Sequence, residues 1–145
     1  MNQSETVTLF NDMCLLAPST LVDAKVDWRP IDAQRVGGTF RNAGQTITAE
    51  LVFDPRGDLA SFSSNDRYMS ADGKTYSNYR WTTPVRDYRD YGGYRLARSG
   101  DAIWSTPEGE FVYARFELEE VRYDVATGPL AAPVETSPSL SLLPQ

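Results

Sequence analysis

The chain has 145 residues, 41% hydrophobic and 23% charged, a size and composition typical of one globular domain with a real core. Its 20 acidic and 14 basic residues give a net charge of −6. Because acids dilute each basic stretch, we expect no binding to nucleic acid. The sequence has no histidine and a single cysteine, which excludes an internal disulfide, His/Cys zinc sites and Ser-His-Asp or Cys-His catalysis.

The N-terminal segment predicts one helix and then a short second helical piece. Ser4 is a good N-cap, and apolar residues recur at three- and four-residue spacing from Val7 to Ala17. Pro18 ends the helix and begins a turn of helix that reaches Asp23. Cys14 falls on the apolar stripe, so we expect a buried and inert thiol.

Period-two alternation after Val26 predicts an antiparallel meander of about seven strands. The clearest strand, Gln45–Asp54, places Ile47, Ala49, Leu51 and Phe53 on one face, where the helix should pack. The other long strands are expected at Arg35–Asn42, Leu59–Tyr68, Tyr79–Tyr91, Tyr94–Ser105 and Phe111–Val125. A loop is expected at Met69–Ser77. In the last strand the apolar residues move from even to odd positions, which predicts a β-bulge at Glu119-Glu120.

The stretch RDYRDYGGYR, residues 86–95, has two interpretations. Interleaved tyrosine and arginine would suit a base-stacking surface. A hairpin with Gly92-Gly93 as its two-residue loop places Asp90 opposite Arg95 and Tyr91 opposite Tyr94, and it also places Asp87 opposite Arg98. The hairpin is favoured because acids then lie opposite the arginines.

With this hairpin in place, the segment up to Asp124 carries a recognisable series of motifs. They are Asp87-Tyr88-Arg89, Gly92-Gly93, Trp104, Pro107-Glu108-Gly109, Phe111–Tyr113 and Arg122-Tyr123-Asp124, preceded upstream by Pro18-Ser19-Thr20-Leu21 and Trp28. Over roughly Ser4–Asp124 the chain resembles a family of uncharacterised bacterial proteins of unknown function.

Two departures from the family bear on what this resemblance implies. Its members are usually longer, so the chain resembles the C-terminal half of such a protein, and Ala97 stands near a usual proline. By more distant analogy the meander is similar to periplasmic lipoprotein carriers of the LolA/LolB type, whose open half-barrel sheet holds an apolar ligand. Such analogy concerns the fold and leaves function open.

Two carboxylate groupings, Asp87/Asp90 and Glu117/Glu119/Glu120, are interpreted as solvated strand positions with arginine partners rather than as general acids and bases. No calcium loop or phosphate loop pattern occurs, so we expect neither a metal nor a cofactor. The aromatic residues are more numerous than a small flat core needs. They predict either a fuller core or an apolar ligand site at Trp28, Phe53, Trp81, Trp104 and Phe116.

The predicted fold is α+β, with the N-terminal helix packed on a curved, mainly antiparallel, half-barrel-like sheet. Residues 1–125 form the domain, and residues 126–145 form a flexible Pro/Ser-rich tail. The N-terminus lacks a signal-peptide pattern and no apolar run is long enough to span a membrane, so we expect a cytoplasmic protein.

The expected function is a non-catalytic binding module that holds an apolar small molecule, an acyl chain or another lipid on the concave face of the sheet. The alternative is a protein-interaction or assembly domain that uses the open sheet, for example as a homodimer. The helix is too short to cover seven strands, so one of these two must cover the apolar face that remains.

Overall fold

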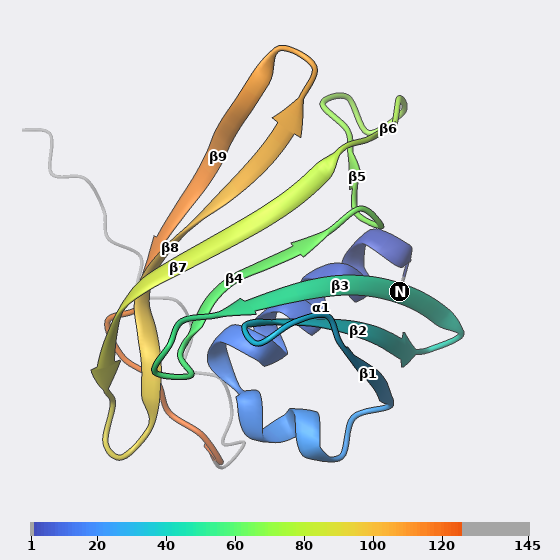
Figure 1. Ribbon diagram of the computed structural model, residues 1–145. Helices are drawn as coiled ribbons and strands as arrows, with labels where there is room; N and C mark the ends of the chain where they lie inside the picture. The colour runs from blue at the N-terminus through green and yellow to red at the C-terminus, as the bar shows by residue number, and fades with distance from the viewer. Residues whose placement is uncertain (1, 126–145) are drawn as a thin grey trace, which may run out of the picture.

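The computed structural model describes residues 2–125. Its N-terminal helix lies on one face of an open, twisted, seven-stranded antiparallel sheet, which confirms the predicted α+β fold (Figure 1). The predicted tail, residues 126–145, lies outside the described residues.

The sheet is a meander with one interruption. In chain order the elements are α1 (Gln3–Leu16), the 3-10 helix η1 (Pro18–Val22), β1 (Val26–Pro30), β2 (Arg35–Asn42), β3 (Gln45–Phe53), β4 (Leu59–Ser64), β5 (Tyr68–Met69), β6 (Ser77–Asn78), β7 (Arg80–Asp90), β8 (Arg95–Thr106) and β9 (Gly109–Glu117). The main sheet has the order β1-β2-β3-β4-β7-β8-β9. β5 and β6 pair only with each other, in the connection between β4 and β7. Most of this connection is the predicted loop Met69–Ser77, but the strand predicted at Leu59–Tyr68 already ends at Ser64.

α1 begins earlier than predicted, because Asn2 is its N-cap and not Ser4. Asn2 and Glu5 form a capping box: the Glu5 amide donates to Asn2 Oδ1 at 2.9 Å, and the Asn2 amide donates to Glu5 Oε2 at 2.8 Å. Ser4 therefore lies in the first turn, where its hydroxyl accepts a hydrogen bond from the Tyr68 amide at 3.0 Å. This bond ties the start of the helix to the β4–β7 connection.

The core lies between α1 and the predicted face of β3. Phe10 is fully buried, stacks on Phe40 at 4.8 Å between ring centroids, and meets the edge of Phe62 at 5.6 Å. Ile47 and Leu51 of β3 are almost fully buried beneath the helix. The period-two pattern of β3 therefore placed its apolar side chains correctly.

The hairpin between β7 and β8 has the predicted register, but its ion pairs differ. Asp90 lies opposite Arg95, and the Tyr91 amide donates to the Tyr94 carbonyl at 2.8 Å around Gly92-Gly93. Arg95 does not pair with Asp90; its Nη2 lies 2.6 Å from Oδ2 of Asp58, in the turn before β4.

The predicted pair Asp87–Arg98 is absent as well. Asp87 accepts a hydrogen bond from the Ser99 hydroxyl at 2.9 Å, and Arg98 instead pairs with Glu117 on β9. Carboxylates on neighbouring strands and turns also form ion pairs with the arginines of the hairpin. A prediction made from the hairpin sequence alone does not include these carboxylates.

The β-bulge predicted at Glu119-Glu120 is wrong in position. β9 ends at Glu117, and its pairing with β8 shifts between Ala102 and Ile103, which leaves Tyr113 as the extra residue. The change from even to odd apolar positions marks the end of the strand. Beyond it, Tyr91 Oη donates to the Leu118 carbonyl at 2.7 Å and holds the chain against the hairpin.

Candidate functional site

Three hollows in the described part of the chain are candidates for a binding site. The first is a polar groove on the face of the sheet turned away from α1. The second is an apolar pocket at the C-terminal end of α1. The third is an aromatic cleft beside β5 and the loop that follows it.

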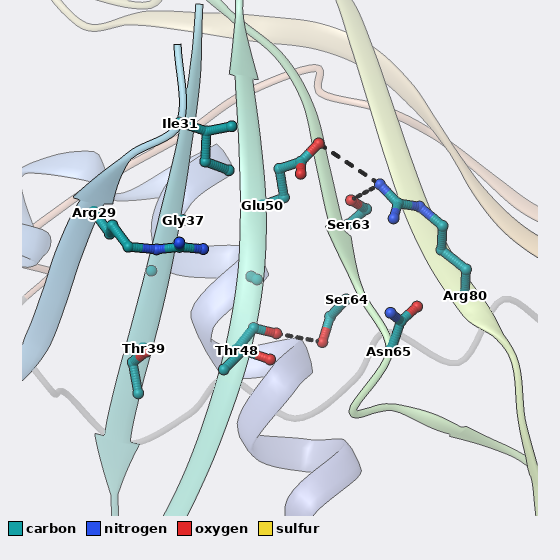
Figure 2. Close-up of a pocket in the computed structure, with 12 residues that line it drawn as sticks. Arg29, Ile31, Gly37, Thr39, Thr48, Glu50, Ser63, Ser64, Asn65 and Arg80 are labelled. Atoms are coloured by element: carbon teal, nitrogen blue, oxygen red, sulfur yellow. Dashed lines mark hydrogen bonds and ion pairs between the residues drawn. The ribbon is translucent and has the colours of Figure 1, made fainter.

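Figure 2 shows the polar groove, which crosses β1–β4 and the start of β7, with α1 behind the sheet. It has a volume of about 230 Å³ and is lined mainly by Arg29, Ile31, Thr39, Thr48, Glu50, Ser63, Ser64, Asn65 and Arg80. Thr48 and Glu50 come from the polar face of β3, and Gly37 of β2 leaves room beside them.

The charges in this groove are exposed and only loosely held. Arg80 Nη2 donates to Ser63 Oγ at 2.7 Å and lies 3.8 Å from Glu50 Oε1 (Figure 2). Arg35 approaches the same carboxylate at 3.9 Å. The Arg29 side chain has no ion-pair or hydrogen-bond partner within residues 2–125. Ion pairs this exposed contribute about 0–1 kcal/mol, so the groove has the character of a solvated sheet face.

The apolar pocket lies between α1, η1 and the adjacent ends of β3, β4, β7 and β8. Its volume is about 210 Å³, and its lining includes Cys14, Leu15, Pro18, Leu21, Leu51, Phe53, Leu59, Tyr88, Arg95 and Leu96. Leu51, Leu59 and Leu96 are buried, so the wall formed by the strands is part of the core. The pocket lies where α1 ends and η1 begins to cover the apolar face of the sheet.

The rim of this pocket is polar, and its positive and negative charges form an ion pair with each other. Arg95 makes a two-point contact with Asp58, at 3.1 Å from Nε and 2.6 Å from Nη2, and its guanidinium lies 5.3 Å from the centre of the Tyr88 ring. Tyr88 donates its hydroxyl proton to the Leu59 carbonyl at 2.9 Å. Burial, with the nearby Asp58 charge, raises the pKa of Tyr88 to about 12, so its phenol stays neutral.

Cys14 gives the pocket no nucleophile. The thiol is buried on α1, and desolvation raises its pKa to about 12. Because only the thiolate reacts or binds a metal, this group is inert at neutral pH, as its place on the apolar stripe predicted.

The aromatic cleft is built around Arg67, in the connection between β4 and β5. The guanidinium carbon of Arg67 lies 4.6 Å from the ring centre of Trp81, 5.3 Å from that of Trp104 and 5.9 Å from that of Tyr113. The indole N–H of Trp81 donates to Tyr113 Oη at 3.0 Å, which fixes these rings relative to each other. Arg67 Nε donates to Thr8 Oγ1 of α1 at 3.2 Å.

Sequence reasoning missed Arg67, since nothing in the stretch Asn65-Asp66-Arg67-Tyr68 marks it as different from other surface arginines. Its neighbours come from α1, β7, β8 and β9, and only the fold brings them together.

The five predicted site residues do not share one pocket. Phe53 lines the apolar pocket, and Trp104 lines the aromatic cleft beside the buried Trp81. Trp28, 42% exposed on the edge strand β1, packs on Phe10 with ring centres 5.9 Å apart. Phe116 lies half-buried on β9, where its ring covers Gly100.

Some chemical features can be stated for residues 2–125. No three or more histidine, cysteine, aspartate or glutamate side chains meet there in a group able to hold a metal ion. None of the helices in that range is long and apolar enough to cross a membrane. Asp90 accepts the Gly93 amide at 3.0 Å in the hairpin loop, and Glu120 pairs with Arg122 at 2.7 Å.

Comparison with known proteins identifies the family but not an activity. No curated protein and no solved structure matches the chain, so the expected similarity to LolA/LolB-type carriers and to the C-terminal half of a longer protein has no support from relatives. Residues 1–116, which include α1 and nearly all of the sheet, match a family of unknown function. The chain therefore belongs to the family DUF6544.

Proposed function

We propose that the domain is a non-catalytic binding module that holds an apolar small molecule in the apolar pocket between α1, η1 and the sheet. The observation that carries the proposal is the composition of this pocket. Leucine, phenylalanine and cysteine side chains form its walls, and the polar groups at its rim are paired with one another. A concave apolar site with few polar groups is the usual form of a small-molecule site.

The size of the pocket limits the ligand. Sites for drug-sized ligands measure roughly 300–1,000 Å³, whereas this pocket measures about 210 Å³. The favoured occupant is therefore a short molecule or the end of an acyl chain. A complete long chain, of the kind expected for a lipoprotein carrier, needs more space than the pocket provides.

The rim indicates that the bound part of the ligand is uncharged. Arg95 is the one cation that lines the pocket, and the carboxylate of Asp58 already neutralises it through two hydrogen bonds. Binding an anionic head group there requires breaking this pair and leaves Asp58 with less compensation. A neutral ligand such as a short alcohol avoids that cost.

Filling the pocket tests the proposal. Leu21 of η1 lines the pocket and packs against the core, whereas its neighbour Val22 is 85% exposed. We expect Leu21→Trp to fill the pocket and to weaken binding of 1-hexanol by tenfold or more, and Val22→Trp to leave it unchanged. Amide chemical-shift changes in two-dimensional NMR give the affinity. Native mass spectrometry of the purified protein shows whether a ligand is carried along.

Two results contradict the proposal. One is equal binding of 1-hexanol by the two tryptophan variants. The other is the absence of shift changes in the wild-type residues that line the pocket, across a series of short alcohols.

A second function, assembly of two copies through the sheet, is favoured by the exposed edge of β9. Phe111, Val112 and Tyr113 are 52%, 39% and 40% exposed on this outermost strand. A long edge strand with consecutive exposed apolar residues is a template for pairing with another strand.

A further inference from the structure

Arg67 is an incompletely satisfied cation inside the fold. It is half-buried, and no carboxylate among residues 2–125 lies within 4.0 Å of it; Asp12 of α1 attracts it only from beyond that distance. Its only hydrogen bond in that range runs from Nε to Thr8 Oγ1, so both terminal nitrogens of the guanidinium have no protein acceptor. Half-buried charges are normally paired, because removing water from an ion without compensation is costly.

The three rings compensate this charge only in part. Cation–π contacts within about 6 Å of a ring centre contribute about 0.5–2 kcal/mol, and Arg67 meets this distance for Trp81, Trp104 and Tyr113. Such contacts are not hydrogen bonds. The terminal N–H groups of Arg67 therefore keep their capacity to donate to an acceptor.

A cleft of about 380 Å³ lies beside this guanidinium. Its lining consists of Arg67, Tyr68, Met69, Ser70, Ala71, Trp104, Phe111 and Tyr113. Tyr68 and Phe111 are 39% and 52% exposed, so large apolar surfaces face the cleft without being covered by the described chain. The volume lies within the range of small-molecule sites.

We propose that this cleft binds a small organic anion with a flat apolar body. The carboxylate, or an anionic group of similar shape, accepts two hydrogen bonds from the terminal nitrogens of Arg67. The ring system lies against the exposed rings of Tyr68, Phe111 and Tyr113. Bidentate recognition of this kind is the particular capacity of arginine, and aromatic side chains stack on flat ligands. The site is separate from the apolar pocket and does not depend on it.

A purely structural role for Arg67 is the competing explanation. In that case the residue ties the β4–β5 connection to α1 through Thr8 and covers the two buried tryptophans. Replacing it then lowers stability and leaves no selectivity for anions. The two explanations differ in one readout, the preference of the wild-type protein for a charged ligand over its neutral counterpart.

The experiment compares 2-naphthoate with 2-naphthamide, which share the flat body and differ in charge. Binding is followed by NMR at the indole N–H signals of Trp81 and Trp104. We expect the wild-type protein to bind naphthoate at least about tenfold more tightly than the amide. Arg67→Gln should abolish this preference. Arg29→Gln, which removes the same charge from a surface arginine whose side chain has no partner among residues 2–125, should retain it.

A second variant covers the case in which Arg67→Gln fails to fold. Phe111 is about half exposed, so Phe111→Ala should fold normally and weaken naphthoate binding several-fold. Leu21→Trp, which alters only the apolar pocket, should leave naphthoate binding unchanged. Equal affinity for the two naphthalenes, an anion preference that survives in folded Arg67→Gln, or full affinity in Phe111→Ala overturns the proposal.

Discussion

Burial determines the pKa and the reactivity of the Cys14 thiol. Desolvation raises its pKa from the ordinary value near 9 to about 12, so the folded state holds the thiol proton more tightly than the unfolded state does. The associated stability is fully present below about pH 9 and is lost as the pH rises toward 12. At pH 8 the native thiol should therefore react with a thiol reagent far more slowly than the unfolded chain.

Labelling with a chromogenic disulfide reagent measures this directly, because Cys14 is the only cysteine of the chain and gives one signal. The same protein in denaturing urea is the control. A native rate close to that of the unfolded chain shows that α1 opens readily or that the thiol is exposed.

The arginines show why partners were harder to predict than positions. The two-residue loop at Gly92-Gly93 predicted that Asp90 and Arg95 lie opposite each other, and the structure confirms this register. The acceptor that Arg95 uses, Asp58, lies 37 residues away in sequence and reaches it through the turn before β4. Arg67 belongs to the same class, since each of its aromatic neighbours comes from another strand.

At the scale of elements, the β7–β8 hairpin depends on glycine in its loop. Gly92 and Gly93 have φ of 66° and 96°, values that disfavour side chains with a Cβ. Gly93→Ala should therefore lower the free energy of unfolding by about 1 kcal/mol. Gly37→Ala is the matched control. Its φ is not positive and its nearest contact to an added Cβ is an ordinary 3.7 Å, so its cost should be close to zero.

Urea denaturation of both variants gives the comparison. Equal losses, or a larger loss for Gly37→Ala, contradict the assignment of the turn as the feature that requires glycine.

Element boundaries were predictable where pattern and turn chemistry agree. β2 was predicted with the bounds that the structure gives, because a two-residue turn at Ala43-Gly44 follows a regular alternation. β9 was predicted too long, and its bulge was misplaced. Tyr113 is the extra residue there, and its position depends on its stacking with Trp104 and on the hydrogen bond from Trp81, both of which are long-range contacts.

At the scale of the whole molecule, the sequence argument held that one helix cannot cover seven strands, but it did not consider that a loop could cover part of the same face. Trp81 and Trp104 lie beyond the main contact of α1, and yet they are 3% and 4% exposed. Arg67 covers them from the β4–β7 connection, although it had been predicted to lie in the strand Leu59–Tyr68, which ends at Ser64. The apolar pocket and the aromatic cleft therefore lie where the cover by α1 stops and η1 or the β4–β7 connection continues it.

The two edges of the sheet differ in how well they resist pairing with another chain. β1 carries Pro30 and the charged residues Asp27 and Arg29, which are features that protect an edge strand. β9 presents Phe111 and Val112 in the first half of its outer edge, with their side chains partly exposed. If two copies of the domain assemble, β9 is the edge at which they should meet.

A charge placed on that edge tests the assembly. We expect the wild-type protein to form dimers at micromolar concentration in sedimentation equilibrium, and Val112→Lys to raise the dissociation constant at least tenfold, because two lysines would be forced together where the strands pair. Val22→Lys adds the same charge at a site that is 85% exposed on η1, and it should leave the dimer intact. A wild-type protein that stays monomeric, or a Val112→Lys variant that dimerises as well as Val22→Lys, contradicts assembly through β9. The exposed aromatic residue Phe111 would then be explained by the anion cleft alone, since it lines that cleft beside Arg67.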